Sequence, residues 1–423
     1  MTNWTRRHFL GAAGAGSLLA GFPAIVRSAT KARIVIVGGG FGGAIAARYL
    51  KMADAGIDVT LIERNKQYVC CPFSNEVISG ERDISTLYFD LRAMATRGVN
   101  VVYDEVTAID PAKKTVATRG GKQFGYDRLI LSPGVELDYA SVEGATPDIE
   151  TVMPHAWKAG EQTLLLKKQL HEMKDGGLAI ITVPKRPYRC PPGPYERASL
   201  MAHYMKHHKP RSKVLILDEG ETMPKQSLFH EGWEKLYPGL VTWTTGNNGG
   251  KILRVDVKKR ALITDVGDYE ADVMNFIPPQ KAAAIAQKTG LTNKDGWCPV
   301  DPVTMESTLQ KGIHVIGDAA LAGDMPKSAH VAAAQAKVVV RAIIAQLDGK
   351  PAPTPYYVNT CYTLMAPDYG FSIAGLYTPS GGNIVAVKDS VTVSPMRAPA
   401  YVRKAEAEYG YSWLKNITAE AFL

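Results

Sequence analysis

A glycine-rich turn joins a buried strand to a helix near residue 40, and few folds accommodate such a turn. The apolar run over residues 31–37 predicts the strand, and Gly38, Gly40 and Gly43 follow it in a G-x-G-x-x-G arrangement. A helical segment and a second strand that ends at Glu63 come next. Glycines in this arrangement let the backbone approach a pyrophosphate at a helix N-terminus, and the acid accepts hydrogen bonds from a ribose. The segment therefore predicts a dinucleotide-binding βαβ unit.

The chain of 423 residues is long enough for two or three domains with complete cores. Its formal net charge is +8, and residues 1–29 contribute three arginines and no acids, so the remainder carries +8 − 3 = +5. This charge is mild for the length, and no basic cluster is interleaved with aromatic residues, so we predict no nucleic-acid site. After residue 29 no apolar run has the length of a membrane span, and we expect no stable membrane insertion.

The N-terminus has the pattern of an export signal. Arg6 and Arg7 precede a Gly/Ala-rich apolar stretch that reaches Val26, and small residues follow it. This order is typical of a twin-arginine signal peptide, which we place at residues 1–29. The twin-arginine route exports proteins that have already folded around a cofactor, so the signal predicts a prosthetic group and a periplasmic location. The alternative is a short N-terminal anchor helix, and the cleavage position stays open because Arg27 fits poorly near the cut.

Two later segments indicate that the dinucleotide is FAD. The strand-like residues 312–316 lead to Gly317 and Asp318, which resemble the second FAD motif of the glutathione-reductase-like flavoproteins, where the carboxylate holds the ribityl chain. Residues 129–134, which end in Ser-Pro-Gly134, resemble the intermediate motif of the same proteins, with Ser-Pro in place of the usual Ala-Thr. Each segment alone is also compatible with an ordinary βα turn. Three motifs in the expected order predict FAD.

The same resemblance predicts an α/β fold with two dinucleotide-binding-type domains and a smaller α+β C-terminal domain. Strand signals at 178–183, 214–217 and 262–264 belong to a second domain that is inserted into the first. The expected boundaries are 1–29 for the signal, 30–154 with 281–350 for a discontinuous FAD-binding domain, 155–280 for a degenerate NAD-binding-like domain, and 351–423 for a C-terminal interface domain.

Two helices are predicted around this C-terminal region. The helix 329–347 follows Lys327, and in the resembled flavoproteins its N-terminus faces the flavin, where the helix dipole favours the reduced anion. We therefore place Lys327 among the cofactor-binding residues. In the final helix Ala405, Tyr409, Trp413 and Ile417 share one face, which we expect to pack on the core.

The second domain has lost its nucleotide loop. After the predicted strand 178–183, a glycine-rich loop would bind the pyrophosphate of a nicotinamide nucleotide, but the chain has Cys190 among prolines there. Proline has no N–H to offer a phosphate. A thiol site has taken the place of a nicotinamide site.

Cysteine spacing limits the redox chemistry. The chain has five cysteines and neither a C-x-x-C pair nor a C-x-x-C-H motif, so it binds no c-type haem of its own. Any redox disulfide joins cysteines that are distant in sequence, and spacing alone does not select the pair. His203, His207 and His208 have a spacing that suits a metal, but a solvated helix face is the favoured interpretation, and we predict no metal site.

Five segments spread over the chain resemble the flavoprotein subunit of flavocytochrome c sulfide dehydrogenase. They are Cys71-Pro-Phe-Ser-Asn-Glu-Val-Ile78, Cys190-Pro-Pro-Gly-Pro-Tyr-Glu196, Trp297-Cys-Pro-Val-Asp301, Asn359-Thr-Cys-Tyr362 and Tyr411-Ser-Trp413. The resemblance implies a periplasmic, FAD-dependent sulfide:cytochrome c oxidoreductase. It also implies a heterodimer with a c-type cytochrome subunit, which carries the haem.

The resemblance further assigns roles to individual residues. It implies a thioether from Cys71 to the flavin, a redox disulfide between Cys190 and Cys361, a proton acceptor at Glu196, and Trp413 near the flavin ring. Each has an alternative. The alternative for Cys71, which has Cys70 as its neighbour, is a buried structural thiol. The alternative for the disulfide is a purely structural bridge. The alternative for Glu196 is an acid near a helix start that the helix dipole favours. Cys298 is expected to be inert.

Three other functions share parts of this pattern. A sulfide:quinone oxidoreductase has the same fold and a cysteine pair, but it needs an apolar C-terminus, whereas residues 400–423 contain several charges. A single-chain NADH dehydrogenase is disfavoured by the missing second glycine loop. A non-catalytic flavin-binding or assembly subunit would keep only the fold, and sulfide would then not bleach its flavin.

Overall fold

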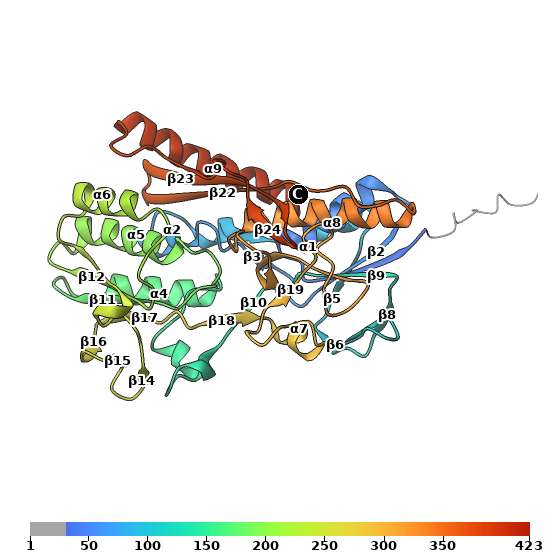
Figure 1. Ribbon diagram of the computed structural model, residues 1–423. Helices are drawn as coiled ribbons and strands as arrows, with labels where there is room; N and C mark the ends of the chain where they lie inside the picture. The colour runs from blue at the N-terminus through green and yellow to red at the C-terminus, as the bar shows by residue number, and fades with distance from the viewer. Residues whose placement is uncertain (1–30) are drawn as a thin grey trace, which may run out of the picture.

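The computed structural model describes residues 31–423, and the predicted export signal lies outside the described residues. A five-stranded parallel sheet, in the order β20-β9-β1-β2-β5, forms the centre of the first domain. Its strands are β1 (Arg33–Val37), β2 (Asp58–Glu63), β5 (Asn100–Tyr103), β9 (Arg128–Leu131) and β20 (Ile313–Val315). The helices α1 (Phe41–Ala53) and α8 (Ala329–Leu347) pack against each other beside this sheet (Figure 1).

Two glycines of the fingerprint are required by close backbone approach. Gly38 has a φ of +99°, and a Cβ there would lie 2.2 Å from the carbonyl oxygen of Ser132. A Cβ on Gly43 would lie 1.8 Å from the carbonyl oxygen of Gly38. Neither position accepts a side chain, so α1 begins close against the end of β1.

The second domain repeats this architecture with a smaller sheet. Its four parallel strands lie in the order β13-β12-β11-β17. They are β11 (Leu178–Val183), β12 (Lys213–Asp218), β13 (Val241–Thr244) and β17 (Val273–Asn275), and the domain's helices are α4 (Glu161–Glu172), α5 (Gly193–His208) and α6 (Gln226–Leu236). Figure 1 shows the domain in green and yellow, beside the first domain. The predicted α/β fold class, with two domains of the dinucleotide-binding type, is confirmed.

Short elements complete the two domains. The antiparallel pair β10 and β18 runs between them, and two three-stranded antiparallel sheets, β6-β7-β8 and β14-β15-β16, extend from their edges. The bounds are β3 (Tyr68–Val69), α2 (Ser74–Ser79), β4 (Tyr88–Phe89), α3 (Arg92–Thr96), β6 (Val106–Asp110), β7 (Thr115–Thr118), β8 (Gln123–Gly125), β10 (Val135–Leu137), β14 (Arg254–Asp256), β15 (Ala261–Ile263), β16 (Asp268–Glu270), β18 (Gln280–Ala282), α7 (Ala284–Lys288), β19 (Cys298–Pro299) and β21 (Ala320–Leu321). Five single 3-10 turns also occur, at Ile84–Leu87, Tyr139–Ser141, Pro147–Thr151, Gly246–Asn248 and Gly317–Ala319.

The C-terminal segment bridges the two domains. It contains β22 (Tyr357–Ala366), β23 (Tyr369–Ser380), β24 (Asn383–Ala386), β25 (Thr392–Val393) and the long helix α9 (Ala400–Phe422). Strand β22 packs on α5 of the second domain and on α8 of the first, while α9 covers β22 and β23 (Figure 1). Residues on β22 therefore lie at the junction of all three parts.

The buried face of α9 differs from the prediction. Tyr409 is 58% exposed, and the stripe that faces the protein consists of Arg403, Ala407, Gly410, Leu414, Ile417 and Ala421. The reason is close packing, because a Cβ on Gly410 would lie 3.3 Å from Phe73 and from Tyr362. The small residue Gly410 lets this face of α9 pack closely against its neighbours, and the periodicity of apolar residues alone does not predict such a contact.

Helix α8 corrects the expectation that no apolar run after residue 29 has the length of a membrane span. By length and composition it could cross a membrane, with a mean hydropathy of 1.2 over its window. However, 56% of that window is buried inside the protein, where α8 packs on α1 and β22. These contacts are those of a core helix.

Candidate functional site

A cavity of about 690 Å³ extends from the glycine fingerprint of α1 to the start of α8 and to β22. Most of the predicted site residues line it. They are Gly38, Gly40, Glu63, Cys71, Gly134, Cys190, Glu196, Gly317, Asp318, Cys361 and Trp413. The tertiary structure thus brings together residues that are separated by more than 300 positions in the sequence.

The nucleotide end of the cavity is organised by Glu63. One of its carboxylate oxygens accepts a hydrogen bond of 2.7 Å from the Gly39 amide, and the other accepts one of 2.9 Å from the Asn65 amide. Gly40 is the N-cap of α1 and has no side chain to fill the space at the helix start. A ribose hydroxyl and a pyrophosphate fit these groups.

Two orphaned polar atoms indicate where a cofactor fits deeper in the cavity. The Oδ1 atom of Asp318 and the indole N–H of Trp157 are both buried, and neither has a hydrogen-bond partner among the described residues. Burial raises the pKa of Asp318, while Arg189 and Lys327 act in the opposite direction. Buried polar groups normally have partners. A ribityl hydroxyl at Asp318 would satisfy one of them, so the residues present fit FAD.

Two predicted cofactor residues lie outside the cavity wall. Gly43 packs against the Gly38 carbonyl, so it contributes to the helix–strand contact. The ammonium of Lys327 donates to the backbone carbonyls of Asp318 and Ala320 at 2.8 Å each, and it lies 3.8 Å from the centre of the Trp297 ring. Lys327 therefore holds the backbone next to Asp318, and burial lowers its pKa to about 8.

Cys71 lies in the wall just before α2, which begins after the left-handed residue Phe73. Its sulfur accepts a hydrogen bond of 3.5 Å from the Ala159 amide, and it lies 3.9 Å from the Trp157 carbonyl oxygen. Arg189 also donates to that carbonyl. The thiol is consequently fixed at the cavity surface, whereas its neighbour Cys70 is completely buried.

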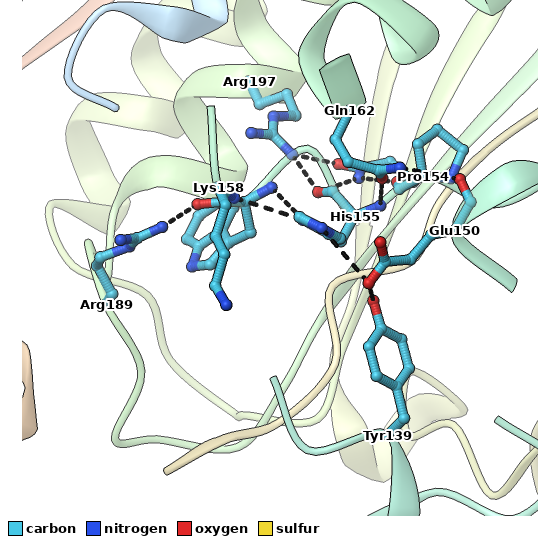
Figure 2. A network of polar contacts seen from close by, with 10 residues as sticks. Tyr139, Glu150, Pro154, His155, Lys158, Gln162, Arg189 and Arg197 are labelled. Atoms are coloured by element: carbon cyan, nitrogen blue, oxygen red, sulfur yellow. Dashed lines mark hydrogen bonds and ion pairs between the residues drawn. The ribbon is translucent and has the colours of Figure 1, made fainter. Parts of the chain in front are cut away.

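The loop at residues 154–158 is fixed by a buried arginine (Figure 2). Arg197, on α5, is 2% exposed and donates to the carbonyls of His155 at 3.0 Å and Ala156 at 2.6 Å. It also donates to Asn75 at 2.9 Å and to Asn275 at 2.7 Å. One guanidinium thus joins α2, α5, β17 and the loop, and its burial lowers the pKa of Arg197 to about 9.

A neutral histidine completes this loop. The Nδ1 atom of His155 accepts a hydrogen bond of 2.7 Å from the Trp157 amide, and its Nε2 atom lies 3.7 Å from Glu150, which also accepts from Tyr139 (Figure 2). Burial, with Lys158 and other nearby cations, lowers the pKa of His155 to about 3. The ring is therefore neutral near pH 7 and positions Trp157 without adding charge to the cavity.

The two cysteines of the predicted disulfide lie at the boundary of two cavities. Cys190 and Cys361 line the large cavity, and both also line a second cavity of about 340 Å³, which contains Tyr188, Ile373 and Tyr377 in its wall. Both are free thiols in the structure, so the predicted disulfide is not formed there. Burial raises the pKa of each thiol.

Backbone geometry brings Cys190 to this boundary. Cys190 has a φ of +55°, and its amide donates to the Lys327 carbonyl at 2.8 Å. A Cβ on Gly193, the first residue of α5, would lie 3.1 Å from the Cys190 sulfur and 2.8 Å from the Trp157 ring. Glycine is required at this position because the sulfur and the ring both approach the backbone.

Glu196 lies one turn into α5 and faces the large cavity. Its carboxylate accepts hydrogen bonds of 2.8 Å from the Leu364 amide and 3.1 Å from the Asn75 amide group. Burial raises the pKa of Glu196 to about 7, although these hydrogen bonds and the charge of Lys225 favour the carboxylate. The group can therefore take up or release a proton near neutral pH.

Trp413, on α9, lines the large cavity beside two other rings. Its ring centre lies 6.2 Å from that of Tyr362 and 6.2 Å from that of His330, which is in the first turn of α8. The Nδ1 atom of His330 accepts from the Thr360 amide at 2.7 Å. An aromatic wall thus stands next to Cys361.

Sequence reasoning missed Lys225 and Arg197. Both are buried cations, with 8% and 2% exposure, and they contact the segments that carry the cysteines. Lysine and arginine are so often exposed that nothing in a single sequence marks a buried one. The burial of each cation is explained only by its hydrogen bonds to distant elements, which are to β22 for Lys225 and to α2 and β17 for Arg197.

The remaining cysteines and histidines lie apart from the cavities. Cys298 is completely buried on β19, and burial raises its pKa to about 12. His207 and His208 are exposed, as expected for a solvated helix face, whereas His203 is partly buried and lies 3.4 Å from the carboxylate of Glu81. No group of three or more potential metal ligands occurs within residues 31–423.

Comparison with known proteins adds information on the family. Residues 163–278 match the family described as the central part of the sulfide dehydrogenase [flavocytochrome c] flavoprotein chain. Residues 353–422 match the flavin-binding family of flavocytochrome c sulphide dehydrogenase, and residues 32–171 match the pyridine nucleotide-disulphide oxidoreductases. The matched segments thus include those that carry Cys71, Cys190 and Cys361.

Individual relatives show the same likeness. A stretch of 45 residues, 11% of this chain, is 58% identical to the sulfide dehydrogenase [flavocytochrome c] flavoprotein chain of Chlorobaculum thiosulfatiphilum and covers 94% of that sequence. The mitochondrial sulfide:quinone oxidoreductase of Dictyostelium discoideum is 26% identical over 337 residues, which are 77% of this chain and 73% of that protein. The solved sulfide:quinone oxidoreductase of Aquifex aeolicus has a TM-score of 0.71 at 16% identity, with 92% of each chain covered, and shows the shared fold.

Proposed function

Because the chain belongs to the family of flavocytochrome c sulfide dehydrogenase flavoprotein chains, we propose that it oxidises sulfide through a Cys190–Cys361 redox disulfide. The electrons pass to FAD, which is attached covalently through Cys71, and then to a c-type cytochrome subunit that carries the haem. The site of action is the periplasm, reached by the twin-arginine route.

One observation carries the proposal more than any other. Cys190 and Cys361 line both the large cavity, whose residues fit FAD, and the second cavity of about 340 Å³. A disulfide at this boundary is accessible to a small anion from one side and to the cofactor from the other. This arrangement suits a sulfur couple that relays electrons, and a purely structural bridge does not require it.

The reaction begins as thiol–disulfide exchange with sulfide as the nucleophile. Hydrosulfide attacks Cys190, a new S–S bond forms, the Cys190–Cys361 bond breaks, and Cys361 leaves as a thiolate. A second hydrosulfide attacks the outer sulfur of the Cys190 persulfide and releases hydrodisulfide, HSS⁻, while Cys190 regains its thiol. Two hydrosulfides have then become one hydrodisulfide, and the two cysteines hold the two electrons.

Re-formation of the disulfide releases two electrons and the proton of the Cys190 thiol. Glu196 accepts this proton, because its pKa of about 7 leaves much of it as carboxylate at neutral pH. When bound, FAD supplies the acceptor of the electron pair and a donor of single electrons to a cytochrome. Gly38, Glu63 and Asp318 would hold it, and Cys71 would attach it.

The acceptor lies on another chain, since the sequence has no haem-binding motif of its own. The described structure has a small exposed apolar surface on the C-terminal sheet, formed by Val358 and Leu376, which are each more than 40% exposed. Val358 and Leu376 are cross-strand neighbours on β22 and β23. A surface of this kind is typical of a protein–protein contact, and it supports a docked cytochrome subunit.

Sulfide:quinone oxidoreductase activity is the second candidate, and the relatives of that name favour it because they match most of the chain. The C-terminal helix argues against it. Arg403 on α9 is buried and pairs with Glu231 at 2.9 Å, while Lys404, Glu408 and Lys415 on its other side are exposed. A charged, solvated helix face is unsuited to entering a membrane.

The test is anaerobic mixing of the purified flavoprotein with sulfide or NADH, in the presence of a c-type cytochrome or a quinone. We expect sulfide to bleach the flavin and the cytochrome to reoxidise it. Bleaching by NADH alone, or delivery to quinone alone, would contradict the proposal. Cys361→Ser should retain bound flavin and lose sulfide-driven bleaching, and unchanged activity in this variant would remove the disulfide from the mechanism.

A further inference from the structure

Lys225 is a buried cation that lies behind the strand of Cys361. It is 8% exposed, and its ammonium donates to the Cys361 carbonyl at 3.0 Å and to the Thr363 hydroxyl at 2.6 Å. Cys361 and Thr363 are two residues apart on β22, so their side chains point to the same face of the strand. The ammonium is therefore on the side of the Cys361 sulfur.

Burying this charge is unfavourable without an anion, and the described residues provide none at contact distance. No ion pair of Lys225 occurs among the described residues, although an aromatic ring, that of Phe371, lies 5.3 Å away. Its backbone has a φ of +60°, a conformation that non-glycine residues seldom adopt. Strain of this kind persists where the surrounding structure holds it, often at functional sites.

The ammonium of Lys225 is hydrogen-bonded to the residue whose sulfur gains charge in the proposed reaction, Cys361. Its field acts on the thiols of Cys190 and Cys361 and on the carboxyl of Glu196, and in each case it favours the anion. A fixed charge at the place where negative charge develops stabilises that charge without reorganisation. A thiolate that forms at Cys361 during turnover would be such a charge, and it would be the anion that Lys225 lacks among the described residues.

We infer that Lys225 is an electrostatic positioning residue that makes Cys361 the leaving thiolate and so directs hydrosulfide to Cys190. The inference rests on the proposed disulfide mechanism. In the step concerned, the sulfur of HS⁻ bonds to the Cys190 sulfur, the Cys190–Cys361 bond breaks, and its electron pair stays on Cys361 beside the ammonium. No further oxidant, reductant or proton is needed.

The surroundings of the two sulfurs differ in a way that favours a thiolate at Cys361 over one at Cys190. Burial and the charge of Glu196 raise the pKa of the Cys361 thiol, and the charge of Lys225 lowers it. Burial raises the pKa of the Cys190 thiol well above its usual value. Cys361 and Glu196 also raise this pKa, whereas Lys225 and Arg189 lower it. Because the ammonium is bound to the Cys361 segment and stabilises a thiolate there, and because a more stable thiolate leaves faster, Cys361 is the better leaving group.

The test measures the Cys361 thiol in a Cys190→Ser background, as the rate of iodoacetamide alkylation against pH, with Cys361 identified by peptide mass spectrometry. Lys225→Gln keeps an amide donor for the Cys361 carbonyl and Thr363 but removes the charge. We expect this change to raise the apparent pKa of Cys361 and to slow alkylation at pH 7 by about tenfold, the equivalent of one pKa unit. Lys225→Arg should retain the parent pH profile.

Two controls separate charge from structure. Lys235→Met, in the last turn of α6, the helix whose N-cap residue is Lys225, should leave the Cys361 profile unchanged. In the reciprocal Cys361→Ser background, Lys225→Gln should change the profile of Cys190 less than it changes that of Cys361. A Cys361 profile that is indifferent to Lys225→Gln, or an equal change at Cys190, would overturn the inference.

The outcome is independent of the proposed function, since alkylation needs no sulfide. If the parent protein fails to oxidise sulfide, the proposed function fails while the charge effect on Cys361 can still be measured. If the parent protein oxidises sulfide and Lys225→Gln leaves the Cys361 profile unchanged, only the inference fails. Far-ultraviolet circular dichroism of the Gln and Arg variants verifies that both remain folded.

Discussion

The carboxylate of Glu196 accepts a hydrogen bond of 2.8 Å from the backbone amide of Leu364, which ties α5 of the second domain to β22 of the C-terminal segment. Strand β22 also carries Cys361, while the loop before α5 carries Cys190. The same acid thus lies next to both sulfur-bearing segments. Its protonation and the relative position of the two cysteines are linked through one hydrogen bond.

A pH dependence follows from the raised pKa of Glu196, which burial brings to about 7. The carboxylate accepts the proton, so sulfide-driven flavin reduction should rise as the pH increases through 7. Glu196→Gln has no carboxylate, and we expect slower reduction, by about a hundredfold, with a flatter profile. Stopped-flow flavin absorbance from pH 5.5 to 8.5 measures both rates.

Hydrogen sulfide itself titrates in this range, so the informative quantity is the ratio of parent to variant rates at each pH. A ratio that does not change with pH would show that Glu196 is not the acceptor. Stability provides a second measure. Since the folded pKa lies above the unfolded value, Glu196 should lower the free energy of unfolding as the pH rises from about 4.5 to 7, and the Gln variant should lack this component.

Covalent attachment of the flavin can be assigned by two adjacent substitutions. Cys71 lines the large cavity and Cys70 is completely buried beside it. After acid precipitation we expect the yellow colour to stay with the polypeptide of the parent protein and of Cys70→Ala. Cys71→Ala should release its flavin into the supernatant. Retention of colour by Cys71→Ala would place the link elsewhere.

Removal of the Arg197 side chain should destabilise the protein. In Arg197→Met the carbonyls of His155 and Ala156 and the side chains of Asn75 and Asn275 would each lose a hydrogen-bond donor in the interior. We expect the free energy of unfolding to fall by about 3 kcal/mol. Urea unfolding, followed by flavin and tryptophan fluorescence, measures this change.

A surface arginine provides the comparison for Arg197. Arg211 pairs with Asp175 at 2.8 Å, and its side chain is 77% exposed. Arg211→Met should leave the urea midpoint nearly unchanged, because exposed ion pairs contribute little. Similar midpoints for the two methionine variants would contradict the bridging role of Arg197.

The exposed apolar surface of the C-terminal sheet should be needed for the cytochrome partner. Leu376 is 41% exposed, and a lysine there would bury a charge in any contact made over β22 and β23. We expect Leu376→Lys to weaken co-purification of a c-type cytochrome while sulfide still bleaches the flavin. Leu164→Lys, at an equally exposed position on α4, is the matched control. Equal loss of cytochrome in both variants would argue against this surface.

Local patterns allowed the nucleotide-binding elements to be predicted. The strand that ends at Glu63, the strand Leu178–Val183 and the helix Ala329–Leu347 were each expected where the structure has them. In each case a short-range pattern, apolar runs bounded by glycine or polar residues, reports the local structure directly. By contrast, the contact face of α9 was misassigned, because Gly410 fits against Phe73 and Tyr362 from distant elements.

The sequence by itself determined the α/β class, the FAD motifs and, through its family resemblance, the cysteines of interest. Only the tertiary structure decided that Cys190 and Cys361 lie between two cavities, that the ammonium of Lys225 is buried behind β22, and that Lys327 holds backbone carbonyls outside the large cavity. The physical reason is the distance along the chain over which the determining interactions act. Strand and turn preferences depend on neighbouring residues, whereas burial and electrostatic surroundings depend on residues that folding brings together from distant parts of the chain.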